Sequence, residues 1–130
     1  SMHFSRFIDG KYEAPVKMSA GINAGEYIAH PYIAPDESYL IWDMRREDGL
    51  GQADIYISFR RKDGSWLPAM NMGSTINSDM QESSPQVTHD GKYLFFTRGE
   101  WKVKEDGSRN YVGKRYWVDA KVIEKFRPNS

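Results

Sequence analysis

A few side chains of types that do chemistry lie at the start of short apolar runs. His30 stands directly before Pro31, and Glu26, Glu82 and Ser84 lie in the polar segments that follow two Ile-Asn pairs. A histidine near carboxylates can ligate a metal or move a proton, and these oxygens can also hydrogen-bond a ligand. The sequence holds no HExxH, Walker, GxGxxG or GxSxG pattern. We therefore expect ligand binding rather than catalysis or metal chemistry, and no cofactor.

Two further segments combine cations with glycine or tryptophan. Arg45 and Arg46 follow one apolar run, and Arg98 and Trp101 follow another. An exposed tryptophan beside cations can stack on a sugar ring, a peptide aromatic or a base. Acidic residues interrupt the cations, and 18 Lys+Arg balance 18 Asp+Glu, so we expect no nucleic-acid partner. The candidate ligand-binding residues are His30, Glu26, Glu82, Ser84, Arg45, Arg46, Arg98 and Trp101.

Composition limits the classes of protein to consider. The 130 residues are the length of one domain, and the absence of cysteine excludes disulfide scaffolds and cysteine-ligated zinc. No apolar run approaches the roughly 20 residues of a membrane helix, so we expect no membrane insertion. No signal peptide is visible in this chain, and residues 1–2 are typical of a remnant of tag cleavage.

An internal repeat decides the expected architecture. Residues 9–43 align with residues 63–97 without a gap, giving nine identities in thirty-five positions. The matches include the turn pair Asp9-Gly10 with Asp63-Gly64, and apolar residues stay in register with them. Because turn residues and apolar residues repeat together, we interpret the pattern as a duplication.

Each repeat predicts short antiparallel strands separated by turns. Extended runs begin at Pro31 and Pro85, aromatic and β-branched runs begin at Tyr39 and Tyr93, and a third strand begins at Ile55. A turn at Asp63-Gly64 leads to a fourth strand over residues 66–72. The second copy places its third strand at 116–123, after a loop over 101–114 that is seven residues longer. Four short strands per repeat are the pattern of β-propeller blades.

The strands also predict how the ends of the chain are used. We expect a two-blade unit over 3–130, with the first blade over 18–72 and the second over 73–126. The second blade lacks a fourth strand, and residues 12–18 form a fourth strand without a blade, preceded by a third-strand stub at 3–6. Residues 12–18 of the same or another chain would therefore complete the second blade.

Several segments resemble the WD-repeat-like β-propeller repeats of the TolB type. They are HPYIAPDESYLIWD, DIYISFRRKDGSW, MNMGSTIN, SSPQVTHDGKYLFFTR and YWVDAKVIEKFRP, so the resemblance covers about residues 4–128. It implies an all-β propeller, commonly bacterial and often periplasmic or exported, that binds or scaffolds other molecules. The chain departs from the family in length, because propellers have about four to eight blades and this chain has two.

Two blades cannot close a ring, and faces rich in Trp42, Phe95 and Phe96 would lie in water. The chain is expected either to assemble with copies of itself or to be the C-terminal piece of a longer propeller; the matching ends favour assembly. The function expected is non-catalytic recognition of a protein, peptide or glycan at the loops around the ring axis. The alternative is a glycan-active or peptidase-associated propeller whose site forms only in the full ring.

Overall fold

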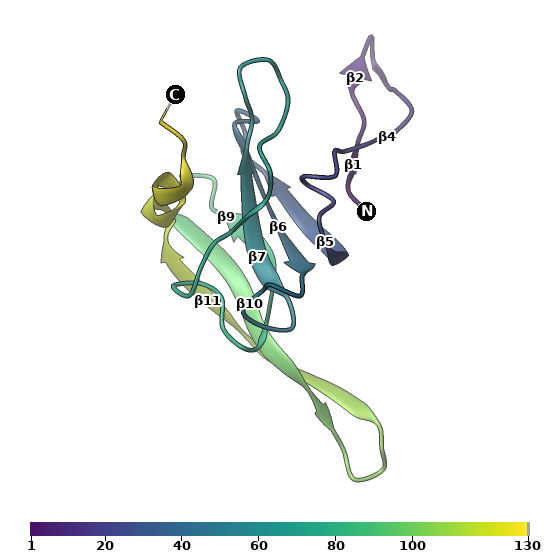
Figure 1. Ribbon diagram of the computed structural model, residues 1–130, viewed down its shortest axis with the longest axis vertical. Coiled ribbons are helices and arrows are strands. Elements are labelled where there is room, and N and C mark those ends of the chain that lie inside the picture. Colours follow the sequence, from purple (N-terminus) through teal and green to yellow (C-terminus); the bar gives the residue numbers. More distant parts are fainter. Residues whose placement is uncertain (130) are drawn as a thin grey trace.

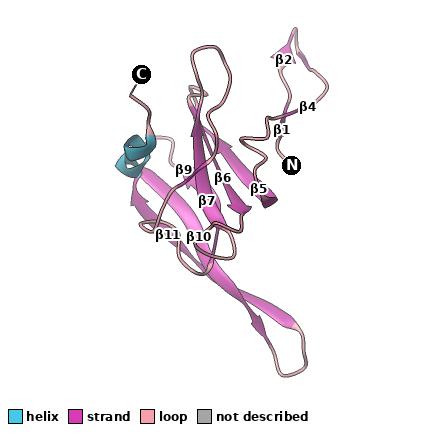
Figure 2. Ribbon diagram, in the orientation of Figure 1, coloured by secondary structure: helices cyan, strands magenta, loops and turns pink. Residues whose placement is uncertain are grey.

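The structure is a computed structural model that describes residues 1–129, and it consists mostly of antiparallel sheet. Its strands are β1 (His3–Phe4), β2 (Phe7–Ile8), β3 (Lys11–Tyr12), β4 (Val16–Lys17), β5 (Glu26–Ile33), β6 (Tyr39–Arg45), β7 (Asp54–Phe59), β8 (Met70–Asn71), β9 (Gln81–Val87), β10 (Tyr93–Val103) and β11 (Arg109–Asp119). A 3₁₀ helix, η1 (Ala120–Phe126), follows them (Figure 2). The all-β expectation is confirmed. None of the helical residues in 1–129 forms a segment long and apolar enough to cross a membrane.

The first sheet has four strands in the order β5-β6-β7-β8. In its centre Ile41 pairs with Ile57 and Trp42 with Tyr56, and side chains on both faces of β6 and β7 are buried. This burial explains the near-continuous apolar runs of these strands. The expected turn at Asp63-Gly64 is present: Gly64 has a φ of +89°, which glycine adopts without strain. The fourth strand is only Met70–Asn71, preceded by a bridge from Trp66 to Arg60.

The second sheet has three strands in the order β11-β10-β9. The expected loop over 101–114 is wrong, because β10 and β11 continue as one hairpin that projects beyond the rest of the molecule (Figure 1). We call residues 99–113 the arm. Cross-strand pairing sustains it: the rings of Trp101 and Tyr111 lie 5.3 Å apart. A turn ends the arm, closed by hydrogen bonds from the Lys104 N–H to the Ser108 carbonyl oxygen and from the Gly107 N–H to the Lys104 carbonyl oxygen.

The expected third strand of the second copy, residues 116–123, is correct only as far as Asp119. From Ala120 the chain forms η1, and the Asp119 side chain caps it by accepting a hydrogen bond from the Lys121 backbone N–H. The helix buries Ala120, Val122 and Ile123 against the sheets. The capped 3₁₀ helix therefore covers the end of the core.

The N-terminal segment forms two small pairs of strands, β1 with β4 and β2 with β3. Residues 12–18 therefore pair with the N-terminal stub of their own chain through Val16–Lys17 and His3–Phe4. Within residues 1–129, no strand lies on the outer edge of β11. Met2, assigned from sequence to a tag remnant, is buried, and its backbone N–H and carbonyl both bond the Asn23 side chain.

Two apolar clusters form the core. One lies between the two sheets and under η1, and it includes Ile41, Leu94 and Phe96. The other lies between the first sheet and the N-terminal segment and includes Met2 and Trp42. The expectation that Trp42 and Phe96 face water is therefore wrong, because sheet packing and the N-terminal segment bury both; Phe95 is half-buried.

Candidate ligand-binding site

His30 and Asp43 form a hydrogen-bonded pair between β5 and β6. The Nδ1 atom of His30 lies 2.9 Å from Oδ1 of Asp43. Asp43 is buried, whereas 57% of the His30 side chain is exposed. A histidine that donates from Nδ1 to a carboxylate leaves Nε2 free to meet a ligand. The pair therefore fixes the orientation of the imidazole ring and leaves its other nitrogen available to a ligand.

The backbone at His30 has the same unusual conformation as its repeat counterpart Ser84. The two residues have φ values of +50° and +52°, and each precedes a proline. Positive φ is uncommon outside glycine and marks positions held by their surroundings. At Ser84 this conformation directs the backbone N–H to Oδ1 of Asp43, at 3.0 Å. Asp43 thus connects both repeats at the candidate site.

Burial shifts the titration of this carboxyl. The pKa of Asp43 is raised because burial disfavours the charged form, and the hydrogen bonds from Ser84 and His30 only partly oppose this effect. Shifted carboxyl groups beside a cavity are characteristic of functional sites, although structural ion pairs show them too.

A cavity of about 620 Å³ lies where the arm leaves the sheets. We call it the arginine cleft. His30 and Asp43 form part of its wall, together with Tyr27, Arg45, Gln52, Gln81, Trp101 and Arg109. The Arg45 guanidinium lies over the Tyr27 ring, 5.9 Å from its centre. Among residues 1–129, neither Arg45 nor Arg109 makes an ion pair, so two unpaired arginines and exposed aromatic rings share the cleft with the Asp43 carboxyl.

A second cavity of about 490 Å³ shares His30 with the arginine cleft. We call it the inner-strand pocket because β5 and β9 supply most of its wall. Arg115 donates hydrogen bonds from Nη1 to the Ser84 carbonyl oxygen and to Oγ1 of Thr97. In the described residues no hydrogen bond joins Oγ of Ser84 to His30, so the contact that begins serine nucleophilic catalysis is not formed.

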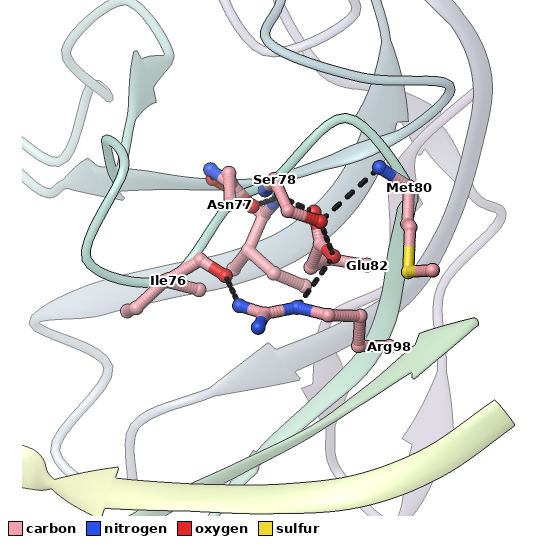
Figure 3. Close-up of polar contacts among 7 residues, drawn as sticks. Ile76, Asn77, Ser78, Met80, Glu82 and Arg98 are labelled. Atoms are coloured by element: carbon pink, nitrogen blue, oxygen red, sulfur yellow. Dashed lines mark hydrogen bonds and ion pairs between the residues drawn. The ribbon is translucent and has the colours of Figure 1, made fainter.

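Glu82 lies away from both cavities in a buried polar cluster (Figure 3). Its Oε1 accepts a hydrogen bond from the Ser78 backbone N–H, and its Oε2 accepts from the Ser78 hydroxyl and from Nε of Arg98 at 3.0 Å. Arg98 also donates to the Ile76 carbonyl oxygen. These contacts hold the loop before β9 against β10, so Glu82 and Arg98 are occupied within the fold.

Glu26 and Arg46 lie in a third cavity, about 870 Å³, beside the loop over residues 46–52. Arg46 donates to both carboxylate oxygens of Asp48. The structure therefore brings His30, Arg45 and Trp101 into the arginine cleft and Ser84 beside His30 in the neighbouring pocket. It does not bring Glu26, Glu82 and His30 into one cavity.

Four residues of the candidate site were not among the candidate ligand-binding residues: Asp43, Tyr27, Arg109 and Arg115. Asp43 carried a usable signal, because an acidic residue inside the apolar run Tyr-Leu-Ile-Trp-Asp-Met needs a partner. Arg109 was visible as one of the cations that follow Trp101 in a segment expected to take part in recognition, whereas Arg115 carried no signal. The placement of both depends on the β10–β11 hairpin.

Comparison of the chain with models of known protein families, with curated proteins and with solved structures finds no match. Function is therefore argued from the geometry of the site.

Proposed function

We propose that the protein is a non-catalytic binding module that recognises carboxylate groups on a protein, peptide or glycan in the arginine cleft. The observation that carries the proposal is the convergence of Arg45, Arg109 and His30 on one cavity beside Trp101. Arginine binds carboxylates with two parallel hydrogen bonds, and an exposed indole supplies stacking area. A mostly concave site with a few directed polar groups is typical of ligand recognition.

We also propose that the two sheets are blades of a β-propeller of the TolB type, completed by self-association. Antiparallel strands in sequential order, the repeated turn at each Asp and the repeated positive φ before Pro31 and Pro85 support this assignment. On this assignment β5 and β9 are the innermost strands, and the two candidate cavities face the ring axis, where propeller ligands commonly bind.

The proposal is tested by binding to peptides and oligosaccharides presented as carboxylates and as their neutral amides. We expect wild-type protein to bind the carboxylates and to lose affinity as salt rises, because the attraction is between charges. The double variant Arg45→Gln, Arg109→Gln is expected to lose about tenfold in affinity, since both arginines are exposed and each exposed ion pair contributes up to about 1 kcal/mol.

The matched control is Lys62→Gln, which removes a cation from an exposed turn outside the three cavities described. It should bind as wild type does. Equal binding of carboxylates and amides, or an equal loss in the control, contradicts recognition of carboxylates in this cleft.

The pair His30–Asp43 favours one alternative, a glycan-active or peptidase-associated propeller enzyme. A histidine in the wall of a cavity, with Nδ1 on a buried carboxylate and its side chain largely exposed, has the arrangement of a general base. This alternative predicts turnover of a glycosidic or peptide substrate that is abolished in His30→Gln and retained in Trp101→Phe. Binding without turnover in wild type argues for the non-catalytic function.

A further inference from the structure

The contact between the two sheets shows which face of each repeat covers the other. The first sheet contributes Ile41, Ile55 and Ile57, and the second contributes Leu94 and Phe96. The side of the first sheet that carries Ile41 is called the leading face, and the side of the second sheet that carries Leu94 and Phe96 is called the trailing face. Because the sheets are repeats, each sheet has a leading and a trailing face. Inside the chain the leading face of the first sheet meets the trailing face of the second, so the trailing face of the first sheet and the leading face of the second are left over.

The trailing face of the first sheet is half covered. Leu40 and Trp42, the counterparts of Leu94 and Phe96, are buried by the N-terminal segment through Met2 and Met18. The N-terminal segment therefore covers the outer part of this face, whereas the first sheet covers the equivalent part of the second repeat.

The inner part of the same face is open. Ile33 is 47% exposed, whereas its counterpart Val87 is 6% exposed beneath the first sheet. Pro31 is exposed and its counterpart Pro85 is buried. A groove of about 580 Å³ runs beside them, with Phe4, Leu40 and Trp66 in its wall. We call it the trailing groove.

The leading face of the second sheet is open as well. Phe95 and Trp117 pair across β10 and β11 at the positions where the first sheet has the buried pair Ile41 and Ile57. Trp117 is 61% exposed and Tyr93 is 40% exposed, and their rings meet edge to face at 5.1 Å. An aromatic patch at this position has no covering element in residues 1–129.

We propose that these two open faces are the two halves of one head-to-tail interface between copies of the chain. Trp117 and Tyr93 of one copy dock in the trailing groove of the next, beside Ile33. The proposed interface repeats the contact inside the chain. There the trailing face of the second sheet covers Ile41, and Ile33 lies on the equivalent trailing face of the first sheet. An interface between unlike faces repeats from copy to copy, and it closes as a ring when the rotation between copies completes a full turn.

The inference rests on the blade assignment of the proposed function and is independent of its ligand. The chain contains no cysteine, so single introduced thiols report contacts cleanly. Ile33→Cys and Tyr93→Cys, the second of which keeps Trp117 in place, are prepared separately, mixed and treated with a short bis-maleimide in the absence of any ligand. We expect covalent dimers in the mixture and few in either variant alone, because the two faces are different.

The matched control replaces Tyr93→Cys with Val103→Cys, since Val103 is 72% exposed near the tip of the arm. Its mixture with Ile33→Cys should give no more dimer than random collision does. Equal cross-linking in the control, or dimers of each single variant alone, overturns the proposed pairing of faces.

A second measurement uses charge in place of cross-linking. Trp117→Glu should reduce the mass in solution to that of one chain, while Val103→Glu leaves the assembly intact. Both side chains are largely exposed, so neither variant should unfold the chain. An unchanged mass in Trp117→Glu overturns the interface. A correct assembly that binds no carboxylate would instead refute only the ligand proposal.

Discussion

Asp43 is the residue at which sheet packing and the candidate site meet. One carboxylate oxygen accepts hydrogen bonds from the His30 ring of its own repeat and from the Ser84 backbone of the next. The same contacts therefore orient the imidazole in the cleft and fix the distance between the two sheets. A change at this residue should affect stability and binding together.

We expect Asp43→Asn to gain stability relative to wild type as pH rises. Burial raises the pKa of Asp43, so the ionised form is less stable in the folded chain than in the unfolded chain. Protonation removes this cost at low pH, and the cost returns as pH rises from about 4, the ordinary aspartate value, through the raised pKa. Urea unfolding across this range should show the midpoint of Asp43→Asn rising relative to wild type. A constant or falling difference contradicts the shift.

Glu82 has a structural role that can be separated from binding. Glu82→Ala leaves Ser78 and Arg98 without their shared acceptor, and we expect a loss of about 3 kcal/mol in the free energy of unfolding. Glu26→Ala, an exposed change, should stay within about 0.5 kcal/mol of wild type. Urea denaturation compares them. Equal stabilities would show that the buried cluster does not hold the loop.

At the scale of residues, part of the candidate site could be identified from the sequence. His30, Arg45 and Trp101 were identifiable because their types stand out beside apolar runs, and the structure places them in one cleft. Glu82 has the same chemical type as a ligand-binding carboxylate. Its burial against Arg98 depends on a strand pairing across sixteen residues, which composition alone does not indicate.

At the scale of elements, one turn recurs throughout the chain. An aspartate side chain accepts a hydrogen bond from the backbone N–H two residues later in each of four turns. The four aspartates are Asp36, Asp63, Asp90 and Asp106. Such turns set the strand connections locally, which is why the sequence predicted those around β6, β7 and β10 correctly.

The hydrogen bonds of these turns shift the pKa values of the four aspartates in a way that NMR can measure. The pKa of each carboxyl is lowered, first by a hydroxyl hydrogen bond and then by the backbone N–H. Their stabilisation is therefore present above the ordinary aspartate pKa and is lost as pH falls below it. Ser65→Ala should move the pKa of Asp63 back toward its ordinary value and leave Asp90, which bonds Thr88, unchanged. No movement of Asp63 would show that the hydroxyl bond is not formed in solution.

The arm and η1 mark where element prediction fails. The arm's sequence is polar and contains Gly99, Gly107 and Gly113, which are typical of a loop. Its strands form because β10 and β11 continue pairing in register. The stability that comes from this pairing is not part of the strand propensity of the individual residues. The apolar residues of η1 fit the pattern of a strand and of a buried helix equally well, and the Asp119 cap favours the helix.

At the scale of the whole molecule, the repeat explains both what is buried and what is open. The internal sheet contact buries one leading face and one trailing face, and the N-terminal segment covers half of another. The remaining open surfaces carry Ile33 on one side and Trp117 on the other. The sequence predicted self-association from unmatched strands; the structure adds the exposed faces on which the proposed interface is built.

The most direct test of this account is the mass of the wild-type chain in solution, measured by light scattering after size-exclusion chromatography over a range of concentrations. The account predicts a discrete assembly of two, three or four chains of 15.0 kDa each, unchanged by added carboxylate ligand. A mass of 15.0 kDa at every concentration would contradict the head-to-tail interface and the ring built from it.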